Sequence, residues 1–71
     1  MSPKQWRGMV ESFNRKSCER TLDAIRAQGS RYVVRIGGRK QGTVRHFSSK
    51  SGAVIAVKAY YRMALARQIG A

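Results

Sequence analysis

Acidic residues are scarce in this chain, and residues 24–71 contain no Asp or Glu at all. Only 3 Asp and Glu stand against 15 Lys and Arg, which gives a formal net charge of +12 at pH 7. The acid-free segment carries these basic residues: Arg26, Arg31, Arg35, Arg39, Lys40, Arg45, Lys50, Lys58, Arg62 and Arg67. Because no carboxylate within that segment can neutralise them, we expect a partner with negative charge.

Cysteine and histidine each occur once, as Cys18 and His46. A single thiol forms no intramolecular disulfide, and a lone histidine provides no ligand set for zinc. The three acids, Glu11, Glu19 and Asp23, lie in the first third and form no recognisable pair for acid–base catalysis. The sequence therefore predicts that the protein is not an enzyme and has no catalytic residues, bound metal or cofactor.

Long hydrophobic runs are also missing. The longest strongly apolar run, residues 53–57, is far shorter than the ~20 residues that a transmembrane helix needs. The N-terminus lacks the apolar stretch of a signal peptide, and a free thiol fits a reducing compartment. We therefore expect a cytoplasmic protein, in the host cytoplasm if it is viral, with no membrane partner. With 71 residues the chain makes one domain, residues 1–71, around a small core.

The first helix has clear start signals. Ser2 is a good N-cap, and Pro3 suits the first helical position. An apolar stripe follows at positions i, i+3, i+4 and i+7. This stripe consists of Trp6, Met9, Val10 and Phe13. We expect these four side chains to belong to the core.

A second stripe follows with a different phase. It consists of Cys18, Leu22 and Ile25. At 100° per residue this stripe lies nearly opposite the first one, so one straight helix would point them in opposite directions. We therefore predict a break at residues 14–17 and a second N-terminal helix that is capped by Ser17 and ended by Gly29. A first strand at residues 21–27 is the alternative.

A β-hairpin is expected next. Residues 31–36 and 43–47 are rich in β-branched and aromatic side chains, and three glycines lie between them. One register of this hairpin gathers Arg31, Arg35 and Arg45 on one exposed face, whereas a slip of one residue separates them. Both registers are compatible with the sequence. Two further cations, Arg39 and Lys40, lie in the glycine-rich turn.

The chain ends in a long helix that Ser48 or Ser49 caps and Gly70 ends. Its core stripe is Val54, Val57, Tyr61, Ala64 and Leu65. The first turn lacks the usual acid and contains Ser49 and Lys50, which favours binding of a phosphate. Lys58 and Arg62, four residues apart without an acidic partner, fit either a solvated face or a row of phosphate contacts.

These elements predict an α+β fold with two N-terminal helices, a β-hairpin and a long C-terminal helix packed on it. In the alternative, a further strand extends the hairpin to a three-stranded sheet. Residues 32–64 resemble the small DNA-binding domains of phage-type tyrosine integrases and of the plant AP2 class. The resemblance lies in the strand at residues 32–36, in Gly42, in Phe47-Ser48-Ser49, and in Ala53, Ala56 and Tyr60. It implies a sheet in the DNA major groove, with Arg31, Arg35 and Arg45 reading bases. The first strand of that family has no evident counterpart here.

The function that these observations favour is DNA binding by a phage- or plasmid-type regulator or recombination accessory factor. The candidate nucleic-acid-binding residues are Arg31, Arg35, Arg39, Lys40, Arg45, Ser49, Lys50, Lys58 and Arg62. The alternative is a phage-type inhibitor, similar to an anti-CRISPR protein or a polymerase inhibitor, that binds an acidic or nucleic-acid-binding surface of a host complex. Double-stranded RNA binding is a third hypothesis, and a homodimer is compatible with each.

Overall fold

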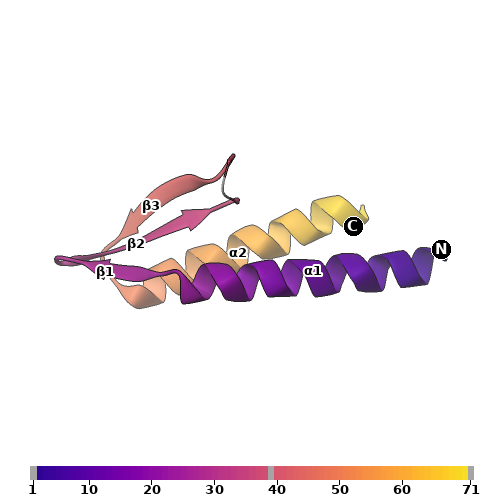
Figure 1. Cartoon of the computed structure of the whole chain (residues 1–71), viewed down its shortest axis with the longest axis horizontal. Helices are drawn as coiled ribbons and strands as arrows, with labels where there is room; N and C mark the ends of the chain where they lie inside the picture. The colour runs from indigo at the N-terminus through magenta and orange to yellow at the C-terminus, as the bar shows by residue number, and fades with distance from the viewer. Residues whose placement is uncertain (1, 39, 71) are drawn as a thin grey trace.

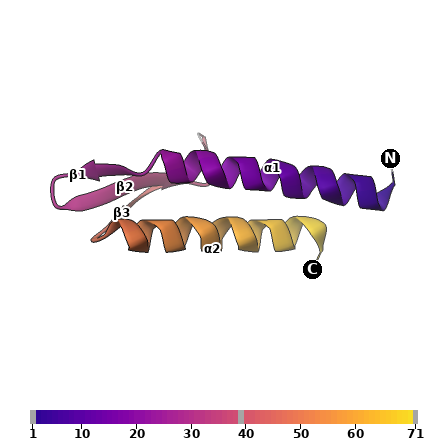
Figure 2. The ribbon, with the colours of Figure 1, turned by 90° about the horizontal axis from the view of Figure 1, so that it is seen from below.

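Two helices and a three-stranded sheet make up the protein in a computed structural model that describes residues 2–38 and 40–70. In chain order the elements are α1 (Pro3–Asp23), β1 (Arg26–Gln28), β2 (Arg31–Ile36), β3 (Thr43–Phe47) and α2 (Lys50–Ile69). The helices run side by side in opposite directions, and the sheet lies over one end of the pair (Figures 1 and 2). The expected α+β class is confirmed.

The sheet is antiparallel throughout, in the order β1-β2-β3. Gln28 pairs with Arg31, which leaves a turn of two residues between β1 and β2. The first of these, Gly29, has a φ of 62°, the left-handed value that a type II′ hairpin turn needs at that position. Gly29 therefore shapes a hairpin turn and does not end a helix as expected.

The N-terminal region is one continuous helix, so the predicted break at residues 14–17 is wrong. Instead, the helix continues through these residues, and Asn14 forms a hydrogen bond with Tyr61 of α2. Thr21, further along the same helix, also forms a hydrogen bond with Tyr61. The helix ends at Asp23, so the alternative strand at residues 21–27 is only partly matched: β1 begins later and shares only Arg26 and Ala27 with that range. The N-cap is confirmed, because Ser2 Oγ accepts a hydrogen bond from Gln5 N at 3.2 Å.

The core lies between the sheet and the two helices. Val34 and Ile36 of β2 and Ala53 and Val57 of α2 are buried, with exposed fractions of 2%, 6%, 0% and 0%. Cys18, Leu22 and Ile25 are partly buried against this cluster. The second apolar stripe therefore packs in the core as expected. The first one does not, since Trp6, Met9 and Phe13 are exposed and only Val10 of that stripe is half-buried.

Tyr61 joins the two helices by both its backbone and its side chain. Its carbonyl oxygen accepts a hydrogen bond from Asn14 Nδ2 at 2.9 Å. Its hydroxyl lies 2.8 Å from Thr21 Oγ1, which itself donates to the carbonyl oxygen of Ser17. Since the Thr21 proton is used in that bond, the Tyr61 hydroxyl is the donor to Thr21.

We predict that Tyr61→Phe lowers the free energy of unfolding by about 1 kcal/mol, because it removes one part-buried hydrogen bond between the helices. The matched control is Tyr60→Phe, which removes the same atom from the neighbouring, more exposed ring. Urea denaturation followed by circular dichroism measures both. Equal losses in the two variants would contradict this account of the helix contact.

Candidate nucleic-acid interface

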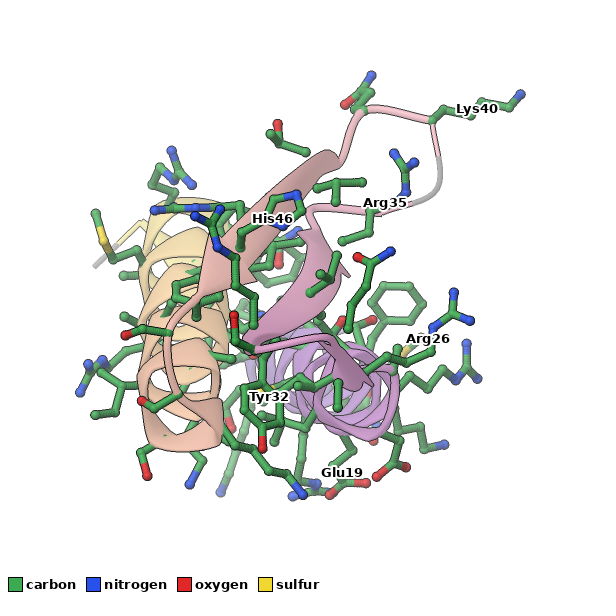
Figure 3. The ribbon with its side chains drawn as sticks, turned by 90° about the vertical axis from the view of Figure 1, so that its left-hand side faces the viewer. Glu19, Arg26, Tyr32, Arg35, Lys40 and His46 are labelled. Atoms are coloured by element: carbon green, nitrogen blue, oxygen red, sulfur yellow. The ribbon has the colours of Figure 1, made fainter. Side chains whose placement is uncertain are left out.

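One face of the sheet is free of helices. Since Val34 and Ile36 point to the core, the alternate residues of β2 point the other way. Directly paired residues of antiparallel strands share a face, so the register adds residues of β1 and β3 to that side. We call this surface the open face; it consists of Arg26, Gln28, Arg31, Val33, Arg35, Val44 and His46. Figure 3 shows Arg26 and Arg35 pointing outwards and Tyr32 pointing towards the helices.

The open face is strongly cationic. Arg26, Arg31 and Arg35 are all exposed, and they come from two adjacent strands. His46 of β3 lies opposite Val33 and is exposed as well. The nearest acid is Asp23 at the end of α1, which lines a shallow hollow together with Arg26 and Arg35. A face of this composition attracts anions and leaves several guanidinium donors free for them.

Arg35 also supports the tip of the β2–β3 hairpin. Its Nη1 donates a hydrogen bond to the carbonyl oxygen of Gly42 at 3.0 Å. Gly42 N in turn donates to the carbonyl oxygen of Gly38 at 3.1 Å. Lys40 extends into solvent from this tip (Figure 3). Arg39, which we expected beside it, lies outside the described residues.

Gly42 is a position where a side chain does not fit. A Cβ there would overlap the carbonyl oxygen of Gly38 and lie 2.9 Å from that of Ile36. We predict that Gly42→Ala lowers the free energy of unfolding by about 1–3 kcal/mol, because the backbone of the hairpin must move. Gly8→Ala is the control, since a Cβ at Gly8 meets nothing within 4 Å in the interior of α1.

The control should be stabilising by about 0.5–1 kcal/mol, because alanine favours a helix interior over glycine. Thermal denaturation of both variants measures these opposite shifts. A stable Gly42→Ala protein would show that the tip of the hairpin is not closely packed.

Arg45 lies apart from the open face. It pairs with Val34, which places it on the helix side of edge strand β3. Its guanidinium carbon is 5.5 Å from the centroid of the Phe47 ring, a cation–π distance. Of the two hairpin registers that the sequence allowed, the structure has the one that separates Arg45 from Arg31 and Arg35. Arg45 remains exposed at the edge of the sheet.

Of the two predicted caps of α2, Ser48 and Ser49, the structure has Ser49. Ser49 Oγ accepts a hydrogen bond from Gly52 N at 3.1 Å, so this hydroxyl oxygen already has a partner within the helix. The first turn contains no acid, and Lys50 is exposed. Lys50 is therefore free to contact an anion, whereas the main role of Ser49 is to cap the helix.

Lys58 and Arg62 lie on a different surface. They line a groove between α1 and α2 together with Arg15, Glu19 and other residues of the two helices. The sheet packs on the opposite side of the helix pair, where Val57 is buried. The cations of the acid-free segment thus do not form one surface: Lys58 and Arg62 face away from Arg31 and Arg35.

Arg26 was not among the residues that we selected from the sequence, because the region before Gly29 was expected to be helical. A usable signal was present in Gly29-Ser30, since a glycine followed by a small polar residue is typical of a two-residue hairpin turn. Such a turn before the strand at residues 31–36 predicts a preceding strand. With antiparallel pairing, that strand brings Arg26 opposite Val33.

Comparison with known proteins identifies no relative: no family model, no curated protein and no solved structure matches the chain. In the part of the chain that the structure describes, no group of three or more His, Cys, Asp or Glu side chains could hold a metal ion. Neither of the two helices described is long and apolar enough to cross a membrane. The arrangement of the open face is therefore the main observation on function.

Proposed function

We propose that the protein binds double-stranded DNA by placing the open face of its sheet in the major groove. The observation that carries this proposal is a helix-free, three-stranded face bearing Arg26, Arg31 and Arg35. With ~4.8 Å between neighbouring strands, the backbone of such a sheet is about 10 Å wide. The major groove of B-DNA is ~12 Å wide and accommodates a structure of this size, whereas the minor groove does not.

The side chains of the open face suit base recognition. An arginine can donate two hydrogen bonds to the O6 and N7 atoms of guanine, and a glutamine such as Gln28 can pair with adenine. Lys40 at the hairpin tip would contact phosphates beside this face, and Arg45 at the sheet edge and Lys50 at the start of α2 are exposed cations that could contact the flanking backbone. A phage- or plasmid-type regulator or a recombination accessory factor would use such a site.

DNA is favoured over RNA for a geometric reason. The major groove of an A-form RNA helix is deep and narrow, so a sheet cannot enter it. The resemblance of residues 32–64 to integrase and AP2-type domains implies the same use of a sheet. The order of three strands and a helix over residues 26–69 supports this use of the sheet.

The proposal is tested with two double variants that remove the same charge from opposite sides of the protein. Arg26→Gln with Arg31→Gln changes the open face, and Lys58→Gln with Arg62→Gln changes the helix groove. We expect the first pair to weaken binding to a DNA duplex at least about tenfold, since each lost bidentate contact is worth about 1–3 kcal/mol. We expect the second pair to change affinity less than about threefold. Fluorescence anisotropy measures both.

Equal losses in the two pairs would show that only net charge matters and would contradict the assignment of the open face. A duplex RNA of the same length is the second probe in this assay. Tighter binding to RNA than to DNA would favour the double-stranded RNA hypothesis instead.

Salt dependence tests the contribution of phosphates. With roughly 4–6 phosphate contacts, the logarithm of the affinity should fall with the logarithm of the salt concentration at a slope of about −4 to −5. A titration from low to moderate salt measures this slope for the unchanged protein. Affinity that does not change with salt would contradict an electrostatic mechanism.

The second candidate is an inhibitor that occupies an acidic or nucleic-acid-binding surface of a host complex. The observation in its favour is the exposure of Tyr60 and Met63 on α2, at 37% and 63%. Such a protein would bind free DNA poorly. Recovery of one acidic partner from nuclease-treated host lysate, together with weak binding in the duplex assay, would favour this candidate over DNA binding.

A further inference from the structure

The N-terminal half of α1 carries an apolar stripe that stays largely exposed in the fold. Trp6, Met9 and Phe13 are 45%, 59% and 70% exposed. Since α1 is one straight helix, only the opposite stripe, which includes Cys18 and Leu22, can reach the core. The spacing of Trp6, Met9 and Phe13 is that of a buried helix face, yet they meet solvent.

No other element of the described chain covers this stripe. The first turns of α1 extend beyond the C-terminal end of α2, and the sheet lies over the other end of the helix pair (Figures 1 and 2). Phe13 lies beside α2, where it lines a hollow with Tyr60 and Ala64, but it remains 70% exposed. Three large side chains at these exposures leave on the order of a few hundred Å² of apolar surface in one place. The largest apolar patch on a monomer is often functional, which makes this stripe the candidate interaction surface.

The charges around the stripe indicate the kind of partner. At 100° per residue, the positions beside it are the uncharged residues Gln5, Ser12 and Ser17. The charged residues of this half, Lys4, Arg7, Glu11 and Arg15, fall on the opposite side of the helix. Lys16 and Arg20 lie on the same face as the stripe, beyond its C-terminal end.

An acidic partner would be held by cations beside the apolar contact, whereas the flanks of this stripe between residues 5 and 13 are uncharged. A second copy of the chain also carries a charge of +12, so it can approach only at a surface whose neighbouring cations point away from the contact. The stripe is such a place, so its surroundings fit another copy better than an acidic protein.

We propose that two copies of the protein associate through this stripe. The two α1 helices would lie antiparallel about a twofold axis near Met9, which places Trp6 of one copy opposite Phe13 of the other. The contact is smaller than the ~800 Å² per partner of a standard stable complex. The dimer is therefore weak and reversible. This inference does not rest on DNA binding.

The intrinsic fluorescence of the protein can be used to detect this contact, because Trp6 is the only tryptophan in the sequence. We expect its fluorescence emission to shift to shorter wavelength as the protein concentration rises, since the ring leaves water. Analytical ultracentrifugation over the same range should show a mass that increases from 8.0 kDa towards twice that value. A monomer with unchanged emission at every concentration would overturn the proposal.

Added salt separates this association from DNA binding. Screening reduces the repulsion between two highly positive copies, so salt should strengthen the dimer while it weakens binding to DNA. Self-association that salt abolishes would contradict an apolar contact. Failure to dimerise would leave duplex binding in dilute protein unaffected, so the two proposals fail independently.

Met9→Glu is the variant that tests the surface. A charge at the centre of the contact should weaken dimerisation at least about tenfold. Ile55→Glu is the matched control, because Ile55 is a similarly exposed apolar residue of α2, at 68%. Circular dichroism confirms that both variants keep the fold. A dimer that survives Met9→Glu, or that Ile55→Glu disrupts equally, would show that another surface forms the contact.

Discussion

The packing of Val34 and Ile36 of β2 against Ala53 and Val57 of α2 determines the rest of the structure. Because side chains alternate along a strand, burial of these two β2 residues forces Arg31 and Arg35 to the opposite face. Ala53 has a small side chain and is completely buried, so α2 lies close to the sheet. The helix thus excludes water from one face of the sheet and leaves the cations of the other face available.

The core that holds this arrangement is small, with four buried residues named above and a ring of partly buried ones. A net charge of +12 opposes folding through repulsion. The structure reduces this repulsion by distributing the cations, since Lys58 and Arg62 lie on the helix side and Arg26, Arg31 and Arg35 on the sheet side. A bound polyanion would reduce it further on the open face.

The two halves of α1 have different environments. Its C-terminal half packs in the core through Cys18 and Leu22 and binds α2 through Asn14 and Thr21. Its N-terminal half has a comparable apolar stripe, but Trp6, Met9 and Phe13 of that stripe stay exposed, and its first turns extend beyond the end of α2 (Figure 2). One domain thus presents a cationic sheet face at one end and an apolar helix face at the other.

Local sequence determined several elements by itself. The hairpin strands at residues 31–36 and 43–47, the Ser49 cap of α2 and its end at Gly70 agree with the expectations, because each depends on neighbouring residues alone. Gly70 has a φ of 73°, the left-handed value of a helix-ending glycine. The basic composition and the choice of Arg31 and Arg35 as exposed residues came from the sequence in the same way.

Tertiary contacts decided the rest. The sequence alone predicts that the helix breaks at residues 14–17. In the fold, Asn14 donates a hydrogen bond to the carbonyl oxygen of Tyr61, 47 positions away in the chain, and the helix continues. The three residues of β1 carry no strand pattern of their own, and only the Gly29-Ser30 turn before the next strand indicates them. Arg26 was therefore not selected from the sequence, and pairing with β2 places it on the open face. The register that places Arg45 opposite Val34 depends on which face α2 covers, and a pattern of alternating residues cannot specify that choice.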